Sequence, residues 1–320
     1  MTTHLFLYGE VEKMGHATGL VNAHTHLEQT WLDPFRPDVT GTTFTDWITG
    51  TLGAAKQAVG ERRPAAIREG IERGIQMLLD SGTSSVGDIS STGWSIGPLL
   101  ESGLSGIVWV EVRATSTEMG EEALQKARAL IAEWRPRERN GMRIGLTLHA
   151  PYSLLPHYWQ AGLAYAKAEG LPVCIHAAES REEYEWFRHG RGPMQETMER
   201  ARMDFPSPGV SPIRYLEESG ALELKPLLVH TVQVDADDIA IIKRNGCAVV
   251  HCPRSNLRLR CGRMPLEQFL AAGVPVYMGT DSLGSSPSLD VRDEIEVAVA
   301  LHWGLVEASR IVKLAQQPLP

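Results

Sequence analysis

Histidine and acidic side chains recur at the ends of short apolar runs in this chain. His24 and His26 close the first such run, His176 closes the fifth, and Asp281 follows the eighth. Imidazole nitrogens and carboxylate oxygens are ligands that suit zinc and ferrous iron. These four residues can hold one divalent ion and leave a coordination position free for water. The sequence therefore predicts a catalytic metal site.

The spacing of these residues is informative only when they are taken together. His24 and His26 lie two residues apart, and the alternation of a strand directs both side chains to the same face. Among eleven histidines such a pair arises by chance in roughly one sequence of three, and H-x-x-E at His176 and Glu179 is equally weak alone. However, five of the eight expected strands deliver a histidine or an aspartate at the same end. A fold that needed only stability would avoid polar groups there.

The polar residues around this site suit proton transfer. A bound divalent ion lowers the pKa of water toward about 7. Glu179 can carry a proton from that water to the substrate and then to the leaving group. His230, at the end of the sixth run, can hydrogen-bond the attacking oxygen or the developing tetrahedral centre. Asp281 can accept the water proton as well as bind the ion, so we assign catalytic roles to these three residues.

Eight short β-branched runs alternate with longer helical patterns along the chain. We expect strands at 19–26, 83–89, 106–113, 143–149, 172–177, 226–231, 246–251 and 274–280. We expect helices at 64–80, 94–102, 118–134, 156–169, 212–219, 235–245, 264–272 and 290–303. Strands that are apolar on both faces and alternate with helices form a parallel sheet covered on both sides. The pattern predicts an α/β fold, a closed (β/α)8 TIM barrel over residues 19–303.

An open doubly wound sheet is the alternative architecture. It predicts a glycine-rich phosphate turn after the first strand, but here that strand runs straight into His24-Thr25-His26. Two segments, 28–60 and 180–211, are too long for simple connections, and in a barrel both lie on the catalytic face. The aromatic residues of the first segment require burial, which argues against a solvated loop there. For residues 190–211 a solvated loop is an equally open interpretation.

Composition excludes several classes of protein. The chain has 320 residues, of which 43% are hydrophobic and 22% charged, as in ordinary globular proteins. A net charge of −8 without a basic block argues against nucleic acid as a partner. No apolar run is long enough to span a membrane, and no secretory signal is evident. The four cysteines form no C-x-x-C pair, so we expect reduced thiols and a cytoplasmic location. The expected partner is a small-molecule substrate, and a homo-oligomer stays open.

The motifs resemble those of the amidohydrolase superfamily, and most closely its branch of one-metal purine-ring deaminases and triazine hydrolases. The matching pieces are GLVNAHTHLE at 19–28, LHAPYS at 148–153, IHAAE at 175–179, LVH at 228–230, HCPRSN at 251–256 and GTDS at 279–282. The resemblance implies the metal ligands and catalytic residues named above and adds His149 as a contact of the substrate's heterocycle. The strand at 143–149 lacks the lysine that often bridges two ions in such hydrolases, which favours one zinc or iron(II) ion.

Within this branch, HTHLE and the later DWI at 46–48 are most similar to the deaminases of aminodeoxyfutalosine, a compound of menaquinone biosynthesis. The resemblance implies hydrolytic release of ammonia from an aminated purine nucleoside. Glu28 and Arg113 are then expected at the rim as substrate-binding residues, and a structural pair between them is equally open. The alternatives are a deaminase of adenosine-type compounds or guanine, a chlorohydrolase or amidase using the same site, and a non-catalytic barrel.

Members of the superfamily carry a small β-sandwich beside the barrel. Only 18 residues precede the first expected strand, and the sequence ends at Pro320. We therefore expect a reduced or absent sandwich, with residues 1–18 as its remnant and residues 304–320 as a C-terminal tail. His251 looks like a metal ligand by residue type, but the ligand set is complete without it, and we assign it a supporting role. His302 has no partner signal and is expected at the surface or in packing.

Overall fold

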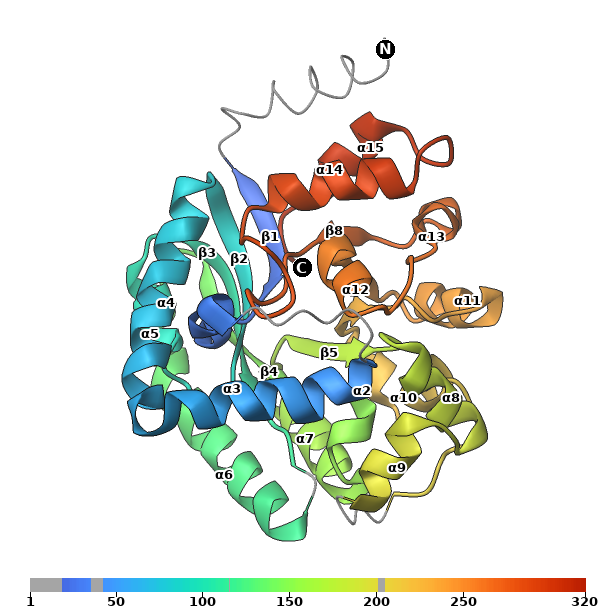
Figure 1. Cartoon of the computed structure of the whole chain (residues 1–320), viewed down its shortest axis with the longest axis horizontal. Coiled ribbons are helices and arrows are strands. Elements are labelled where there is room, and N and C mark those ends of the chain that lie inside the picture. Colours follow the sequence, from blue (N-terminus) through green and yellow to red (C-terminus); the bar gives the residue numbers. More distant parts are fainter. Residues whose placement is uncertain (1–18, 36–42, 115, 201–204) are drawn as a thin grey trace.

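Eight parallel strands form the centre of the molecule in the computed structural model of this chain (Figure 1). The structure describes residues 19–35, 43–114, 116–200 and 205–320. The strands pair in chain order and are β1 Leu20–Thr25, β2 Thr83–Ser90, β3 Ser105–Glu111, β4 Met142–Thr147, β5 Val173–Ala177, β6 Leu227–His230, β7 Ala248–His251 and β8 Val276–Met278. The predicted (β/α)8 barrel is confirmed. The expected sandwich remnant at 1–18 lies outside the described residues.

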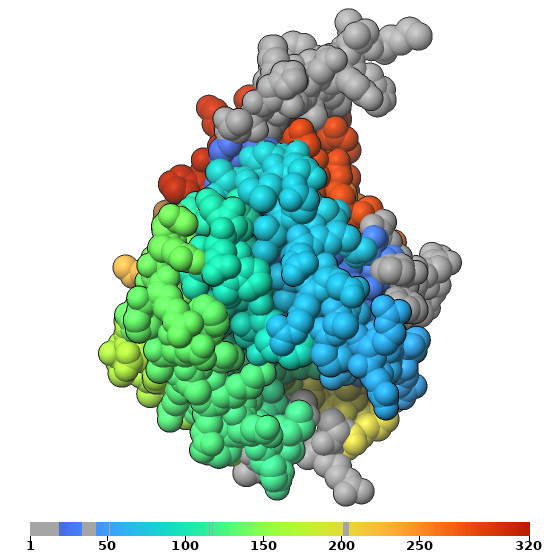
Figure 2. All heavy atoms as spheres, turned by 90° about the vertical axis from the view of Figure 1, so that its left-hand side faces the viewer, coloured from blue at the N-terminus to red at the C-terminus, as the bar shows by residue number. Residues whose placement is uncertain are grey.

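Helices surround the strands. In chain order they are α2 Phe44–Asp46, α3 Leu52–Val59, α4 Arg63–Asp80, α5 Ile96–Glu101, α6 Thr117–Trp134, α7 Pro156–Glu169, α8 Arg181–His189, α9 Pro193–Arg200, α10 Pro212–Glu218, α11 Ala236–Arg244, α12 Pro253–Arg258, α13 Leu266–Ala272, α14 Val291–Leu301 and α15 Ala308–Leu314. Seen from one side, α4, α5 and α6 form a continuous outer surface (Figure 2). Within the described ranges, no helix combines the length and the apolar composition that a membrane crossing requires.

The helix boundaries reflect local sequence signals. Asp235 caps α11, because its side chain accepts a hydrogen bond from the Asp238 amide. The chain leaves the same helix through Gly246, whose φ of 68° lies in the left-handed region that glycine tolerates. In α4, Ile67 and Ile71 lie at helical spacing on one face, and that face is buried against the sheet.

Trp109 fills the interior of the barrel at β3. Its ring is buried in a cluster of apolar residues that come mostly from the other strands. Gly87 on β2 and Gly145 on β4 flank it. A Cβ atom would lie 2.6 Å from the indole ring at Gly87 and 2.5 Å from it at Gly145. The two glycines therefore leave the volume that the large side chain occupies, which gives an interior packed by complementary sizes.

The barrel closes at the point where the predicted metal ligands lie. Between Asn22 and Thr25, β1 advances three residues while its partner β2 advances two, which is the signature of a β-bulge. Thr25 then bridges Asp281, beyond the end of β8. The Asp281 amide donates to the His24 carbonyl oxygen at 2.9 Å. Closure of the sheet thus brings the first and last strand ends into contact.

The two long segments that follow β1 and β5 fold into helices. In the first, a 3₁₀ helix at Leu27–Phe35 and the helical stretch of α2 and α3 bury Trp31, Phe44 and Trp47. The second forms α8 and α9 up to residue 200. Residues 304–320 contain α15, and the Ala315 carbonyl oxygen accepts a hydrogen bond from the Val21 amide at 2.7 Å. The end of the chain therefore packs against β1.

Asp88, at the carboxyl end of β2, joins β1 to the loop before α5. Its Oδ1 lies 2.8 Å from the Leu27 amide and 3.0 Å from the Thr25 hydroxyl, and its Oδ2 lies 2.7 Å from the Ser95 hydroxyl. The side chain is fully buried, and this burial raises its pKa to about 7. Asp88 thereby fixes the residues on both sides of His26.

We predict that Asp88→Ala lowers the free energy of unfolding by about 3 kcal/mol at pH 5, because it removes three buried hydrogen bonds. Since the pKa of Asp88 is higher in the folded chain than its usual 3.8, its contribution is complete at low pH and declines as the pH rises through 7. Urea titrations at pH 5 and pH 8 measure both effects. An equal difference from the wild type at the two pH values would contradict the prediction, and exposed Asp80→Ala is the control.

Candidate active site

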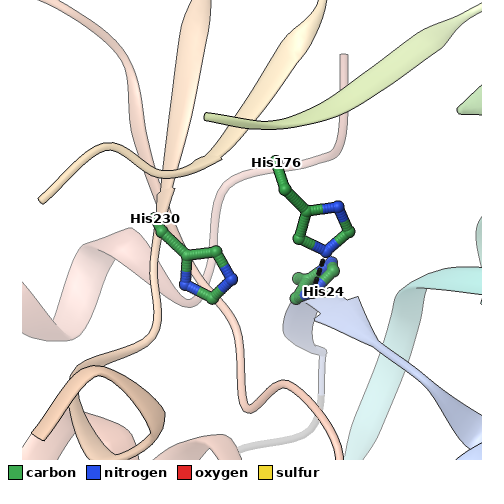
Figure 3. A group of neighbouring side chains, drawn as sticks. All are labelled: His24, His176 and His230. Carbon is green, nitrogen blue, oxygen red and sulfur yellow. Dashed lines mark hydrogen bonds between the residues drawn. The ribbon is translucent and has the colours of Figure 1, made fainter. Parts of the chain in front are cut away.

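Four histidines and one aspartate converge at the carboxyl ends of β1, β5, β6 and β8. Nε2 of His24 lies 3.3 Å from Nε2 of His176 and 3.5 Å from Oδ1 of Asp281, and Nε2 of His26 lies 3.4 Å from the same oxygen. Figure 3 shows His24, His176 and His230 pointing toward one another. Two triads, His24 with His26 and Asp281 and His24 with His176 and His230, each keep their donor atoms within 4.8 Å.

The surrounding hydrogen bonds direct lone pairs into this cluster. Nδ1 of His176 lies 3.0 Å from the His149 carbonyl oxygen and must carry a hydrogen to donate to it, so its Nε2 presents a lone pair. Oδ2 of Asp281 accepts from the Ser255 and Ser285 hydroxyls at 2.6 and 2.8 Å. Its Oδ1 is therefore left to face the imidazoles. Oriented donors of this kind fit a divalent cation.

Burial sets the charge of the cluster. It lowers the pKa of His26 to about 3, and it holds the pKa of His176 well below the usual value, so both imidazoles are neutral at pH 7. Burial acts to raise the pKa of Asp281, but the hydrogen bond with His24 and the nearby histidines hold it well below its usual range. Neutral imidazoles beside an ionised carboxylate are the protonation states that metal binding requires.

Glu179 and His230 lie together at the edge of this cluster, with Oε1 of the glutamate 3.5 Å from Nε2 of the histidine. Burial, followed by the charges of Asp281 and Glu183, raises the pKa of Glu179 well above its usual value. Nδ1 of His230 lies 2.9 Å from the Asn256 side-chain oxygen. Because Nδ1 donates there, Nε2 of the neutral imidazole is an acceptor. The pair can therefore hold and accept protons.

Unusual backbone geometry aims several of these side chains. Ala178, His230 and Asp281 have φ values of 51°, 73° and 63°, in the left-handed region that costs a non-glycine residue roughly 1–2 kcal/mol. Such conformations persist where the surroundings hold them, and they cluster at functional sites. Gly279 allows a close approach at the same place, since a Cβ atom there would lie 2.8 Å from Cβ of His24.

A cavity of about 180 Å³ opens onto the cluster. His26, His176, His230, Glu179 and Asp281 line its floor. The other lining residues are mostly apolar. They come from α2, the π-helical turn at Trp47–Thr51, α3, α9 and the turn after α12, and include Phe44, Trp47, Ile48, Leu52, Met194, Met198 and Leu259. A cavity with an apolar wall and a few convergent polar groups is suited to a small organic molecule.

The start of α2, whose Phe44 lines the cavity, is hydrogen-bonded to α8. The Glu182 carboxylate accepts hydrogen bonds from the Phe44 amide at 2.8 Å, the Thr45 amide at 2.9 Å and the Thr45 hydroxyl. These amides belong to the first turn of α2, where the helix has donors without internal partners. The segment that closes the cavity is therefore anchored to the helix that comes directly after Glu179.

The predicted substrate-binding residues lie in different surroundings. Arg113 and His149 line the cavity, and Nδ1 of His149 lies 2.8 Å from the Ser153 hydroxyl. Glu28 is absent from the lining and buried, and it accepts hydrogen bonds from the Thr92 and Trp94 amides, among others. This favours a structural role for Glu28 in holding the loop after β2. Among the described residues it forms no ion pair with Arg113.

Sequence reasoning missed several supporting residues. Ser255 and Asn256 belong to the HCPRSN motif, but only the fold brings them to Asp281 and His230. The pattern S-x-x-E at 180–183 is a capping signal that could have drawn attention to α8. His302 is fully buried, and its Nε2 lies 3.3 Å from that of His251, so the surface expectation is wrong and the packing expectation holds. His251 is not among the residues that line the cavity.

Comparison with known proteins identifies the family. A model of the amidohydrolase family matches residues 17–315, nearly the whole chain. The chain belongs to the amidohydrolase family. It is 37% identical over 295 residues to an aminodeoxyfutalosine deaminase of Deinococcus radiodurans, with 89% of this chain and 68% of the relative covered.

Two further comparisons extend the picture. The chain is 28% identical to a 5-methylthioadenosine/S-adenosylhomocysteine deaminase of Pelotomaculum thermopropionicum. The match covers 89% of this chain but only 60% of the relative. The fold of this chain matches that of an adenosine deaminase from Xanthomonas campestris with bound zinc. The TM-score is 0.77 at 23% identity, and the match covers 93% of this chain and 65% of that one. The chain thus spans about two thirds of the length of these amidohydrolases.

We predict that each of the variants His24→Ala, His26→Ala, His176→Ala and Asp281→Ala purifies with far less metal than the wild type, because each removes one of four converging donors. Elemental analysis should find about one equivalent of zinc or iron in the wild type and under about 0.2 in the variants. The exposed His157→Ala is the control and should match the wild type. Full metal content in any of the four variants would remove that residue from the ligand set.

Proposed function

We propose that this chain is a metal-dependent hydrolytic deaminase that releases ammonia from an aminated purine nucleoside. The observation that carries this proposal is the position of Glu179, a buried carboxyl with a raised pKa on the floor of the cavity, beside His230 and the donor cluster. Deamination requires that protons move from water to a ring nitrogen and to the leaving amine. A buried carboxyl whose pKa is raised well above its usual value is suited to both transfers.

The metal site of this proposal consists of His24, His26, His176 and Asp281, which hold one divalent ion. Zinc is the first candidate, since the related fold of the Xanthomonas campestris adenosine deaminase carries bound zinc, and iron(II) is the second. An ion at this position lowers the pKa of water and so supplies a nucleophile at neutral pH. The strand β4 contains no lysine that could bridge a second ion, which supports a single metal.

The chain's own residues divide the remaining work. Glu179 protonates the ring nitrogen next to the carbon that is attacked, and later the departing amine. Nδ1 of His230 donates to the Asn256 side-chain oxygen, so its Nε2 is free to accept a hydrogen bond from the attacking water. His149 contacts the heterocycle from the cavity wall. The apolar cover of α2, α3 and α9 excludes water around the reacting atoms.

Aminodeoxyfutalosine is our first candidate substrate, because the relative with 37% identity is named for its deamination. This would assign the chain to menaquinone biosynthesis. Adenosine-type nucleosides such as 5-methylthioadenosine and S-adenosylhomocysteine are the second candidates, on the basis of the other relatives. The exposed Arg113 at the cavity is the residue we propose for a polar or anionic group of the substrate. Glu28, which is held by the loop after β2, acts only indirectly in this proposal.

We predict that the wild type releases ammonia from aminodeoxyfutalosine faster than from other amine-bearing nucleosides. Glu179→Gln should lower kcat by about 10²- to 10⁴-fold, because it removes the proton carrier, and should keep its metal. The half-buried Glu185→Gln on α8 is the control with the same chemical change.

Two results would contradict the proposal. Glu179→Gln at the full rate would exclude the proton-transfer role. A wild type with bound metal that releases no ammonia from any nucleoside, but releases chloride from a chlorinated triazine, would assign the site to the chlorohydrolase alternative.

A further inference from the structure

The turn after β5 reverses the direction that Glu179 would have if the strand continued past Ala177. Cys174 packs inside the barrel and Ile175 packs on its outer side, so alternation directs His176 inward and position 179 outward. Glu179 nevertheless lines the cavity together with His176. The reversal occurs at Ala178, which has a φ of 51°. A non-glycine residue stays in this left-handed conformation only where its surroundings hold it.

The carboxylate of Glu183 holds this turn from one side. Its Oε1 accepts from the Ala178 amide at 3.0 Å, and its Oε2 accepts from the Glu179 amide at 2.8 Å. The Glu183 amide in turn donates to the Ser180 hydroxyl at 3.1 Å, which caps α8. In an ordinary capping box the carboxylate returns to the amide of the cap residue itself. Here the carboxylate also accepts from the two amides that precede Ser180.

The chain after β6 holds the same turn from the opposite side. The Ala178 carbonyl oxygen accepts from the Val232 amide at 2.9 Å and from the Gln233 amide at 2.8 Å. The Ala177 carbonyl oxygen accepts from the Thr231 amide at 3.0 Å. These donors come directly after His230. The peptide that carries Glu179 therefore lies between Glu183 and the turn that carries its proposed catalytic partner.

We propose that Glu183 is the positioning residue for Glu179. Its two carboxylate oxygens accept hydrogen bonds from the Ala178 and Glu179 amides, and this pair of bonds, here called the grip, maintains the turn that aims the Glu179 carboxyl at the substrate. This rests on the proposed function of Glu179. Glu183 is fully buried and is not among the residues that line the cavity. It therefore acts through Glu179 rather than on the substrate.

The chemistry of the grip requires a carboxylate. Two amide N–H groups face its two oxygens, and an ionised carboxylate offers acceptors on both. A glutamine at this position offers one oxygen and one NH₂ group, so one backbone N–H would face another donor. Glu183→Gln thus changes the hydrogen bonding of the turn while nearly preserving the volume of the side chain.

The first test is kinetic and uses the full chain with its metal. We expect Glu183→Gln to lower kcat for ammonia release about 10- to 100-fold, since a misplacement near 1 Å has such an effect. KM should change less than threefold and the metal content should stay at the wild-type level, because the cavity wall and the ligands are unaltered. Glu185→Gln, on the same helix and paired with Arg191 at the surface, is the matched control. An unchanged kcat overturns the proposal.

The second test separates positioning from general destabilisation. If Glu183 acts only through Glu179, the double variant Glu179→Gln with Glu183→Gln is no slower than Glu179→Gln alone. Rate losses that multiply would show an independent effect and would overturn the proposal. Should Glu183→Gln fail to fold, Ser180→Ala replaces it in both tests, because that change removes only the hydroxyl that accepts from the Glu183 amide. We expect a smaller loss of kcat there, in the same direction.

The third test does not depend on activity. Hydrogen exchange of the Ala178 and Glu179 amides should accelerate about tenfold or more in Glu183→Gln, because each amide loses or weakens a buried hydrogen bond. Exchange in β2 and β3 should stay unchanged. Unaltered exchange at these two amides overturns the proposal whatever the substrate is. Accelerated exchange in a chain whose wild type releases no ammonia supports the grip and refutes the proposed function, so the two failures are distinguishable.

Discussion

The structure depends on a cluster of buried polar side chains that face one another. Nε2 of His24, Nε2 of His26 and Oδ1 of Asp281 meet at the mouth of the barrel, where an isolated charge is unstable. The same place contains the bridge between Thr25 and Asp281 that closes the sheet. Closure of the barrel and the donor cluster therefore involve the same residues, and a divalent cation would compensate the charge that is buried there.

A second layer of residues fixes the orientation of this cluster. The short helix α12 supplies Ser255 to Asp281 and Asn256 to His230. The same helix is bound to α14, because Arg254 of α12 donates through Nε to the buried Glu294 of α14 at 2.7 Å. The proposed metal ligands and the proposed proton-transfer residues therefore share one support. Rigid support of this kind keeps the rotamers of functional side chains fixed.

Alternation and strand order made part of the site predictable from the sequence. His24 and Asp281 could be brought together in advance because parallel strands in a barrel end on one face. The role of Glu28 could not be decided from its neighbours, because the loop that binds it belongs to another strand. The spacing of Glu179 to His176 predicts it at the site, but not the backbone geometry that aims it, since a left-handed residue turns the chain there. The contact of His302 with His251 joins residues far apart in sequence, which no local pattern encodes.

The central claim is that four side chains from three strand ends bind a single divalent ion. Anomalous diffraction from crystals of the purified protein, measured on both sides of the zinc and iron absorption edges, tests it most directly. The account predicts one peak about 2.0–2.2 Å from the donor atoms of His24, His26, His176 and Asp281, at one of the two edges. Two peaks, or a single peak away from these residues, would contradict it.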